Sequence, residues 1–588
     1  MESEKRMKTS DYIVRFFEEK EIKVVFGYIG GAITHLVDSI DKNSSIDYIQ
    51  TYHEQTAAFA AEGYARAHKT LGVAIATSGP GATNLITGIA DAFCDNVPML
   101  YITGQVNSYE GKKEKPIRQQ GFQELEIIGV VKNITKYAKH IENALDIPYE
   151  LEKAYQLALE GRQGPVLLDI PMDIQRAEID IEACKRYSNS FSEKSKTFQN
   201  IKEIKQLMME CKRPVILIGG ASEFLTVSVK EKLKLILEMS QIPVICSLMG
   251  KGKISEDKIN FLGMVGSYGN RSANLSMKYC DLLIAVGSRL DTRQTGAKID
   301  SFLENGKIIH VDIDQNELES HRLKNKVNVC MDINDFIEIL VDIMDEYKID
   351  EEWLDKTKLI ASTFSQLNEI KNYAENKEPY HMMLKLNEFC DSNDYFVTDI
   401  GQNQMWAAQT IKIREKQNFY TGGGLASMGF SIPFAVGLAF GGKSRIISIS
   451  GDGGFHMSTQ SLMLISQYSL PIKVLVMNNS SLGMITQFQG LYFNNNLVGT
   501  SAKKGYLVPS IQKIAEAYNL KYYMIKEKDL NDHLLMKEIF SDVKPCIVEY
   551  YVDKPTTVSP KLEFDSPIYN PSPKIDIEDF EKNWFANE

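Results

Sequence analysis

The stretch RIISISGDGGF, residues 445–455, decides how this chain folds. Its β-branched, apolar run is typical of a buried strand, and it ends at the Gly-Asp-Gly triplet of residues 451–453. A second apolar run, residues 472–478, follows a single spacer and ends beside Asn479. Ligands of parallel α/β sheets bind outside the carboxyl ends of the strands, so we expect Asp452 and Asn479 to meet at one site.

The polar groups at these strand ends are suited to a metal bound to phosphate. A carboxylate, a carboxamide and a backbone carbonyl are hard oxygen ligands for Mg²⁺, which completes its shell with substrate phosphates. The glycines around Asp452 let the backbone approach a diphosphate, and a following helix N-terminus adds a favourable dipole. A plain turn would explain Gly-Asp-Gly alone, but the paired Asn478-Asn479 makes that interpretation unlikely.

Working outward, apolar runs that end in Gly-rich turns alternate with amphipathic stretches along the whole chain. This alternation predicts an α/β fold of three doubly wound parallel-sheet domains. We expect domains at residues 1–184, 200–345 and 375–556, a linker at Lys185–Asn200, and a tail at 557–588 that packs over a surface. The strand-like runs are Lys23–Tyr28, Val73–Thr77, Met99–Thr103, Val166–Ile170, Pro214–Gly220, Pro243–Ser247, Asp281–Gly287, Lys307–Asp312, Tyr395–Gly401, Arg445–Gly451, Ile472–Asn478 and Cys546–Val552.

The bulk composition excludes several classes of function. The chain has 588 residues, too many for a single core, and its 66 basic and 77 acidic residues give a net charge of -11. A net negative charge does not favour binding to nucleic acid or to an anionic membrane, so a small-molecule substrate is expected. The 8 cysteines form no CxxC pair, and no apolar run reaches the length of a membrane span. These features predict a cytoplasmic protein without a signal peptide.

The Gly-Asp-Gly triplet, the spacer and Asn-Asn together resemble the thiamine diphosphate (ThDP) signature of the decarboxylase and acetolactate synthase superfamily. The resemblance implies that Asp452, Asn479 and the carbonyl of Ser481 hold Mg²⁺. It also implies that Met428 in GGGLASMGF wedges beneath ThDP, and that Asn403 in TDIGQNQMWAAQ replaces the histidine usual in acetolactate synthases while still donating to a phosphate oxygen. The remaining ThDP contacts implied are Ile400, Gly401, Gln402, Ala426, Gly451, Gly453, Gly454, Gly483, Met484 and Ile485.

A second half of the active site is expected in the first domain. Glu54 begins an Ala-rich helical pattern in TYHEQTAAFAAEGYARA, where an acid is usually only a partner of the helix dipole. This segment resembles the one that carries the indispensable glutamate of the superfamily, which lies against N1′ of the ThDP aminopyrimidine and assists proton removal from C2. The resemblance further implies catalytic roles for Gly31 and Gln123, and a substrate pocket formed by Tyr28, Phe122, Met172 and Phe488.

The middle block resembles the FAD-binding version of the family. Each of its motifs is weak alone, because an arginine can simply pair with surface carboxylates. Together they imply a bound FAD that is held structurally while ThDP performs the chemistry. The implied FAD contacts are Arg162, Gly219, Gly220, Ser247, Leu248, Met249, Gly266, Arg289, Arg293 and Asp312.

The overall resemblance is to acetolactate synthase large subunits. It implies decarboxylation of pyruvate or a similar 2-oxo acid, followed by transfer of the acyl-anion equivalent to a carbonyl acceptor. It also implies a homodimer or a dimer of dimers, with Glu54 and Asp452 of one site on different subunits.

Three departures from the family pattern leave the acceptor open. Met172 replaces a lysine, Phe488 replaces a tryptophan, and the loop Asn107–Gly121 is long. One alternative is therefore a carboligase acting on a nucleotide-linked keto sugar in surface-polysaccharide synthesis. Simple decarboxylation or flavin oxidation is another. A catalytically silent paralogue is a further alternative, but Glu54, Asp452 and Asn479 are all retained.

Overall fold

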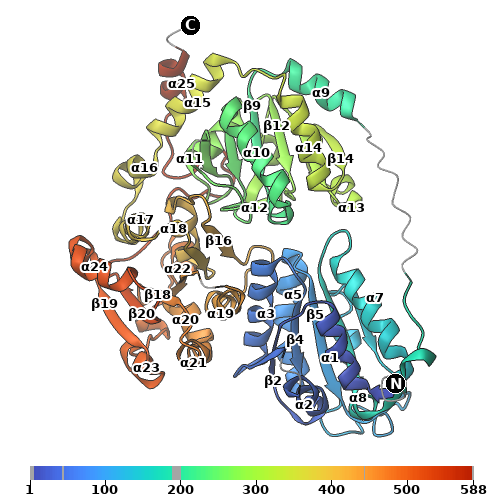
Figure 1. Cartoon of the computed structure of the whole chain (residues 1–588). Coiled ribbons are helices and arrows are strands. Elements are labelled where there is room, and N and C mark those ends of the chain that lie inside the picture. The colour runs from blue at the N-terminus through green and yellow to red at the C-terminus, as the bar shows by residue number, and fades with distance from the viewer. Residues whose placement is uncertain (1–5, 43–44, 189–199, 258, 443, 586–588) are drawn as a thin grey trace.

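The computed structural model of this chain describes residues 6–42, 45–188, 200–257, 259–442 and 444–585. Three domains are present, each built around a six-stranded, wholly parallel sheet with helices on both faces (Figure 1). The predicted α/β fold of three parallel-sheet domains is therefore confirmed. Most of the expected linker, residues 189–199, lies outside the described residues.

The first domain has the strand order β3-β2-β4-β5-β7-β6. Its central strands β4 and β5 are buried along their whole length, which explains their continuous apolar sequence. A small antiparallel pair joins β1 (Arg6–Lys8) to β8 (Glu178–Asp180). The strands are β2 (Val24–Tyr28), β3 (Asp47–Gln50), β4 (Gly72–Ala76), β5 (Met99–Gln105), β6 (Tyr137–His140) and β7 (Pro165–Pro171), and the helices used below are α3 (Glu54–His68), α5 (Ile86–Asp95) and α8 (Met172–Arg176).

The middle domain repeats this design with the order β11-β10-β9-β12-β13-β14. Helix α10 (Val227–Ser240) and helix α14 (Ile333–Met344) pack together on one side, and α11 (Arg271–Tyr279) contacts β11. The strands are β9 (Pro214–Ile218), β10 (Val244–Cys246), β11 (Phe261–Met264), β12 (Leu282–Val286), β13 (Lys307–Asp312) and β14 (Lys326–Cys330).

The third domain carries the Gly-Asp-Gly turn of residues 451–453 at the end of β17. Its order is β16-β15-β17-β18-β20-β19, so β17 and β18 are direct neighbours, paired from Ile446 with Ile472 to Gly451 with Met477. The strands are β15 (Tyr395–Thr398), β16 (Asn418–Thr421), β17 (Ile446–Gly451), β18 (Ile472–Asn478), β19 (Lys521–Ile525) and β20 (Cys546–Tyr551), and the helices used below are α18 (Gln402–Thr410), α19 (Ser431–Gly441), α20 (Asp452–Met457) and α22 (Gly483–Tyr492).

Helices α3 and α19 join the first domain to the third, and they lie side by side between the two sheets (Figure 1). Small residues allow the two backbones to approach closely. A Cβ atom added at Gly437 would lie 1.8 Å from the Ala60 carbonyl oxygen, and one added at Gly63 would lie 2.1 Å from that of Phe434. Glycine is therefore required at both positions.

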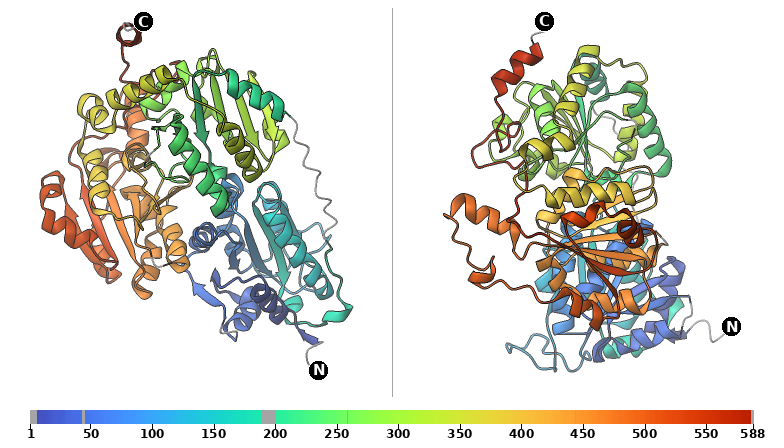
Figure 2. Two further views of the ribbon diagram at one scale, coloured as in Figure 1. Left: turned by 45° about the horizontal axis from the view of Figure 1, so that its top comes forward. Right: turned by 90° about the vertical axis from the view of Figure 1, so that its left-hand side faces the viewer.

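The C-terminal tail returns from the third domain to the middle one, where α25 (Ile577–Phe585) ends the described chain (Figure 2). The prediction that it packs over a surface is incomplete, because Ile568 is fully buried within the middle-domain core. Arg271, also fully buried, donates to the carbonyls of Pro571 and Pro573 and so fixes the tail. Among the described residues, no helix combines the length and apolar character needed to cross a membrane.

Candidate active site

Three neighbouring strands, β15, β17 and β18, direct the loops at their carboxyl ends towards one place. The N-termini of α18, α20 and α22 follow these strand ends, so backbone N–H groups and helix dipoles favour an anion there. Asp452 is 1% exposed; its Oδ2 accepts the backbone N–H of Asn479 at 3.1 Å, and its Oδ1 accepts the Tyr506 hydroxyl. The expected proximity of Asp452 to Asn479 is present.

The donor set around Asp452 fits a hard cation. Burial raises the pKa of Asp452 to about 6, so a cation that stabilises the ionised carboxylate would relieve an unfavourable burial. Asn479 contributes an amide oxygen, and the carbonyl of Ser481 lies two residues further on, where it accepts the Gly483 N–H at 2.8 Å. All three are oxygen ligands, as Mg²⁺ requires.

Glycines create close approaches around this site. A Cβ at Gly483 would lie 2.0 Å from Gln402 Oε1, and one at Gly453 would lie 2.8 Å from Leu482 Cδ2 and 3.3 Å from Met428 Cε. The Gly453 neighbours also place the Met428 side chain next to the Gly-Asp-Gly turn. Gly401 has φ +141, in the region that favours glycine, and it caps α18.

Two predicted diphosphate contacts are already engaged inside the protein. The Asn403 amide nitrogen donates to the carbonyls of Asp399 at 2.8 Å and Ile449 at 3.2 Å, which ties β15 to β17. In this arrangement the side chain has no N–H left for a phosphate, contrary to our expectation. Gln402 Oε1 likewise accepts the Thr556 hydroxyl at 2.6 Å and the Asn479 amide at 3.3 Å.

The other predicted ThDP contacts surround the same strand ends. Ala426 has φ +62, and the segment that leads from it to α19 is fixed by the buried Asp399 carboxylate, which accepts the N–H groups of Gly429 and Ser431, each at 3.0 Å. Gly454 lies against that same carboxylate. Ile400 and Met484 pack on the cores, Gly451 faces Asn403, and Ile485 is exposed.

Glu54 is the first residue of α3 and is 6% exposed. The preceding residue, His53, caps the helix by accepting the Gln55 N–H at Nδ1, 3.1 Å away. Asn84 donates to Glu54 Oε2 at 2.9 Å, and a Cβ at Gly81 would lie 3.2 Å from Oε1. The TSGPGATN turn of residues 77–84 therefore folds over this carboxyl group.

The predicted substrate-side residues mostly lie at the surface of this chain. Phe122 is 86% exposed and Tyr28 is also exposed. Gly31 has open space where a Cβ would stand, and Gln123, with φ +60, brings its carbonyl within 2.9 Å of a Cβ at Gly79. Met172 begins α8, half-buried.

Phe488, in contrast, belongs to an aromatic cluster at α22. Its ring centroid lies 5.0 Å from that of Tyr492, 5.8 Å from Phe493 and 6.2 Å from Phe564 of the tail. The members are partly or largely exposed, and Phe564 is 63% exposed.

Within one chain the start of α3 adjoins the third domain, because Thr56, two residues after Glu54, contacts Ser461 at 3.4 Å. Among the described residues, no hydrogen bond or ion pair joins Glu54 or Asn84 to Asp452, Asn479 or Tyr506. In Figure 1 the helix pair α3 and α19 stands between the two sheets.

A cavity of about 530 Å³ lies between the middle domain and the loops 94–96, 161–163 and 422–426. This volume is typical of a small-molecule or cofactor site. The residues predicted for FAD gather here: Arg162, Gly220, Ser247, Leu248, Met249, Gly266, Arg289, Arg293 and Asp312 all line it. Gly219 stands just outside, where a Cβ would meet the Gly287 carbonyl at 2.0 Å.

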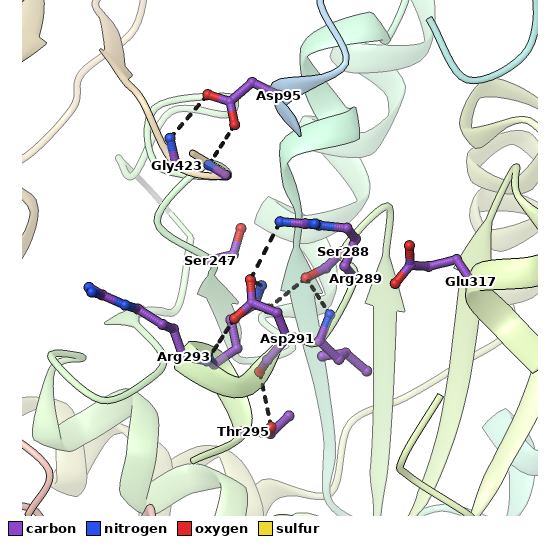
Figure 3. A network of polar contacts seen from close by, with 12 residues as sticks. Asp95, Ser247, Ser288, Arg289, Asp291, Arg293, Thr295, Glu317 and Gly423 are labelled. Carbon is purple, nitrogen blue, oxygen red and sulfur yellow. Dashed lines mark hydrogen bonds and ion pairs between the residues drawn. The ribbon is translucent and has the colours of Figure 1, made fainter. Parts of the chain in front are cut away.

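The lining of this cavity carries three arginines, Arg162, Arg289 and Arg293, which can bind the phosphates of an anionic cofactor, beside five acidic side chains. Figure 3 shows Asp291 between Arg289 and Arg293, with its carboxylate 3.8 Å from the Arg289 guanidinium. Gly266 has φ +128, and a Cβ there would lie 2.7 Å from the Arg293 carbonyl. Arg162 pairs with Asp314 at 3.2 Å and Glu317 at 2.9 Å, so this arginine is partly used by the protein itself.

Comparisons with known proteins agree with this geometry. Residues 7–130 match the N-terminal TPP binding domain of thiamine pyrophosphate enzymes, residues 201–340 their central domain, and residues 399–550 their C-terminal TPP binding domain. The chain belongs to the thiamine pyrophosphate enzymes.

Relatives within the family are acetolactate synthases. The chain is 36% identical to a probable acetolactate synthase large subunit of Methanocaldococcus jannaschii, over 93% of this chain and 92% of the relative. It is 33% identical to the acetolactate synthase isozyme 2 large subunit of Escherichia coli, over 94% of this chain and 97% of the relative. It is 35% identical to the chloroplastic acetolactate synthase of Arabidopsis thaliana, over 89% of this chain and 78% of the relative. This thiamine pyrophosphate enzyme therefore catalyses acyl transfer of the carboligase type, as the sequence predicted.

Sequence reasoning missed three side chains that support the metal half of the site. Tyr506 contacts Asp452, Thr556 contacts both Gln402 and Asn479, and Gln487 pairs with the backbone of Val558. They come from a loop, the segment just before the tail and a helix interior, and no motif marks them.

Proposed function

We propose that this chain decarboxylates pyruvate, or a close 2-oxo acid, and joins the acetyl unit to a second carbonyl compound; with pyruvate as acceptor the products are acetolactate and CO₂. The observation that carries this proposal is the meeting of Asp452, Asn479 and the Ser481 carbonyl at glycine-lined strand ends. Bound ThDP would supply the electron sink for decarboxylation.

In this proposal the metal half binds and orients the cofactor. Asp452, Asn479 and the Ser481 carbonyl would hold Mg²⁺, while the N-termini of α18 and α22 favour the diphosphate. Gln402 and Asn403 would act indirectly. Gln402 holds the Asn479 amide, and Asn403 holds the ends of β15 and β17 together through its hydrogen bonds to backbone carbonyls.

Glu54 would exchange a proton with the aminopyrimidine N1′. Its Oε2 is held by the Asn84 amide, which leaves Oε1 for that contact. The burial of Glu54 excludes water, so the proton moves between defined partners.

The cavity of the middle domain supports a structural FAD. Arg289 and Arg293 would bind its phosphates, and Asp312, at the carboxyl end of β13, would accept from a ribose hydroxyl. Release of FAD by the denatured protein, seen in its absorbance spectrum, would support this assignment, and a colourless protein would contradict it.

We propose a homodimer as the smallest active unit, because no polar contact joins the side chains of the two half-sites among the described residues of one chain, and the exposed Phe122 and Tyr28 need a covering surface. A dimer of dimers and a cytoplasmic location stay predictions.

A second candidate concerns the acceptor. The partly exposed rings of Phe488, Tyr492, Phe493 and Phe564 favour a carbonyl acceptor larger than a 2-oxo acid, since a planar ligand face can stack on them. A nucleotide-linked keto sugar has this chemistry.

Product analysis tests both candidates. Purified protein with ThDP and Mg²⁺ is given pyruvate alone, and then pyruvate in competition with 2-oxobutyrate and keto-sugar acceptors. Acetolactate or acetohydroxybutyrate formation supports the acetolactate synthase reaction, and preferential use of the keto sugar supports the second candidate. CO₂ release without any ligated product would contradict both.

A further inference from the structure

Three acidic side chains meet behind the segment that leads to Met428. Glu62 comes from α3, and Asp91 and Asp95 come from α5, one helical turn apart. One carboxylate oxygen of each lies within 4.8 Å of the others. This cluster is remote in sequence from Asp452 and shares no ligand with the proposed Mg²⁺ site.

Glu62 and Asp91 are buried and Asp95 is half-buried, and part of the cluster has no hydrogen-bond partner among the described residues. Asp95 accepts the N–H groups of Gly423 at 3.0 Å and Gly424 at 2.6 Å, as Figure 3 shows, and Asp91 Oδ1 accepts the Ser427 hydroxyl at 3.2 Å. Asp91 Oδ2 and both oxygens of Glu62 accept no hydrogen bond from any described residue. Glu62 is 0% exposed, so water does not satisfy these atoms from bulk solvent.

The nearby cations do not balance the cluster. Arg66 Nη1 lies 3.6 Å from Glu62 Oε1, but its Nε and Nη2 donate to Glu223 at 3.0 Å and 2.9 Å. Lys253 also pairs with Glu223, at 3.2 Å. Arg66 and Lys253 thus make their closest ion pairs with Glu223 and not with Glu62, Asp91 or Asp95. Arg289 acts on Asp95 from the cavity side, but it is a partly exposed partner of Asp291.

Unbalanced charges of this kind are costly unless a proton or a cation joins them. Burial and the neighbouring Asp95 raise the pKa of Asp91 to about 8. The ionised form of this carboxyl group is therefore unfavourable in its present surroundings. One proton can neutralise only one of these carboxylates, whereas a cation placed between the three carboxylates contacts all of the unpartnered oxygens at once.

We propose that Glu62, Asp91 and Asp95 bind one hard divalent cation, such as Ca²⁺ or Mg²⁺. All-oxygen, carboxylate-rich sites select such ions. Opposite oxygens around Ca²⁺, at bond lengths of about 2.3–2.6 Å, lie about 4.6–5.2 Å apart, and those around Mg²⁺ about 4.0–4.2 Å apart, so the cluster accepts either with small movements. Three bidentate carboxylates can provide the six oxygens that Ca²⁺ needs.

Such an ion would have a structural consequence for both half-sites. It would tie α3, whose first residue is Glu54, to α5 and, through Asp91 and Asp95, to the segment Gly423–Ser427 that precedes Met428. The inference does not depend on the proposed reaction, because the ligands are outside the ThDP contacts.

Mn²⁺ binding by the full-length protein, counted by electron paramagnetic resonance, tests the site. Samples are freed of metal and ThDP and then titrated with Mn²⁺, with and without ThDP. Wild type is expected to bind one Mn²⁺ per chain without ThDP and two with it. Asp91→Asn, which keeps the shape of the side chain, is expected to bind no Mn²⁺ without ThDP. The matched control Asp452→Asn is expected to bind one Mn²⁺ per chain both with and without ThDP.

Thermal unfolding provides the second measurement. Mn²⁺ should raise the melting temperature of Asp452→Asn, and this rise should disappear in the double variant that carries both Asp452→Asn and Asp91→Asn. If Asp91→Asn does not fold, Glu62→Gln takes its place in both measurements. The proposal is overturned if ThDP-free wild type binds no Mn²⁺, or if the Asp91 and Glu62 variants bind as much as wild type does.

Discussion

Glu54 and Asp452 are both buried carboxylates, yet their surroundings fit them for different tasks. Asp452 receives a backbone N–H and the Tyr506 hydroxyl, at strand ends rich in oxygen ligands. Glu54 has one amide partner, Asn84, and a free oxygen beside a glycine turn. A metal ligand and a proton-exchanging acid are the roles that follow.

Replacement of Glu54 by Gln separates these roles. Glu54→Gln should retain ThDP but slow the exchange of its C2 proton and turnover by about two to four orders of magnitude, the usual contribution of general acid–base assistance. Asp452→Ala should instead abolish Mg²⁺-dependent retention of ThDP. Proton exchange is followed by NMR and retention by gel filtration. Equal and mild effects of both changes would contradict the assignment.

Phe488 decides the acceptor in our interpretation. Phe488→Trp enlarges the aromatic wall and adds an N–H donor, and it should shift discrimination between 2-oxobutyrate and bulkier carbonyls by roughly 1–3 kcal/mol, with the release of CO₂ from pyruvate unchanged. Phe493→Trp in the same cluster is the matched control and should shift it less. Competition experiments measure the ratio of the product from 2-oxobutyrate to the product from the bulkier carbonyl. If this ratio is unchanged in Phe488→Trp, the ring of residue 488 does not face the acceptor.

At the scale of elements, every predicted strand exists, and each is one of the four inner strands of its sheet. The strands that sequence reasoning missed in the three large sheets are the edge strands. Inner strands such as β4 are buried on both faces and so have continuous apolar sequences, whereas β6 and β19 are partly exposed and mixed in composition. The edge strands are recognisable only through their pairing partners.

The contact between α3 and α19 should be intolerant of any side chain at Gly63. Gly63→Ala pushes a methyl group into the Phe434 carbonyl and should lower stability by about 1–3 kcal/mol or more, the cost of overpacking. Gly442→Ala is the control, because a Cβ there meets no atom of the described residues within 4 Å, apart from its chain neighbours. Denaturant unfolding measures both. Equal stabilities would show that the helices separate easily.

The segment that leads into the tail should contribute to cofactor retention through Thr556. Its hydroxyl donates to Gln402 and accepts from the Asn479 amide, so Thr556→Val leaves both amides without this partner. We expect about 10–100-fold weaker Mg²⁺–ThDP binding, the usual effect of losing a residue that orients a metal ligand. Thr557→Val, whose hydroxyl has a single hydrogen bond to the described residues, with Glu375 at 3.5 Å, should bind Mg²⁺–ThDP normally. Titration calorimetry compares the two, and matching affinities would rule out this role for Thr556.

At the scale of the whole molecule, the parts of the site that sequence could predict are those carried by contiguous motifs. Glu54 and the Gly-Asp-Gly turn stand in recognisable segments, whereas Tyr506 and Thr556 reach Asp452 and Asn479 only through tertiary packing. The engagement of Asn403 with two backbone carbonyls was equally hidden, because it depends on the spacing of β15 and β17.

Recombination of the two half-sites in mixed dimers tests most directly whether Glu54 and Asp452 cooperate in one ThDP site. Glu54→Gln and Asp452→Ala chains are each nearly inactive. After unfolding and refolding together they should recover about a quarter of the wild-type acetolactate synthesis, because half of the randomly mixed dimers are hybrids and each hybrid has one intact site. Acetolactate formation is measured beside the fraction of hybrids, resolved with differently tagged chains. Demonstrable hybrids without any activity would contradict the proposed site.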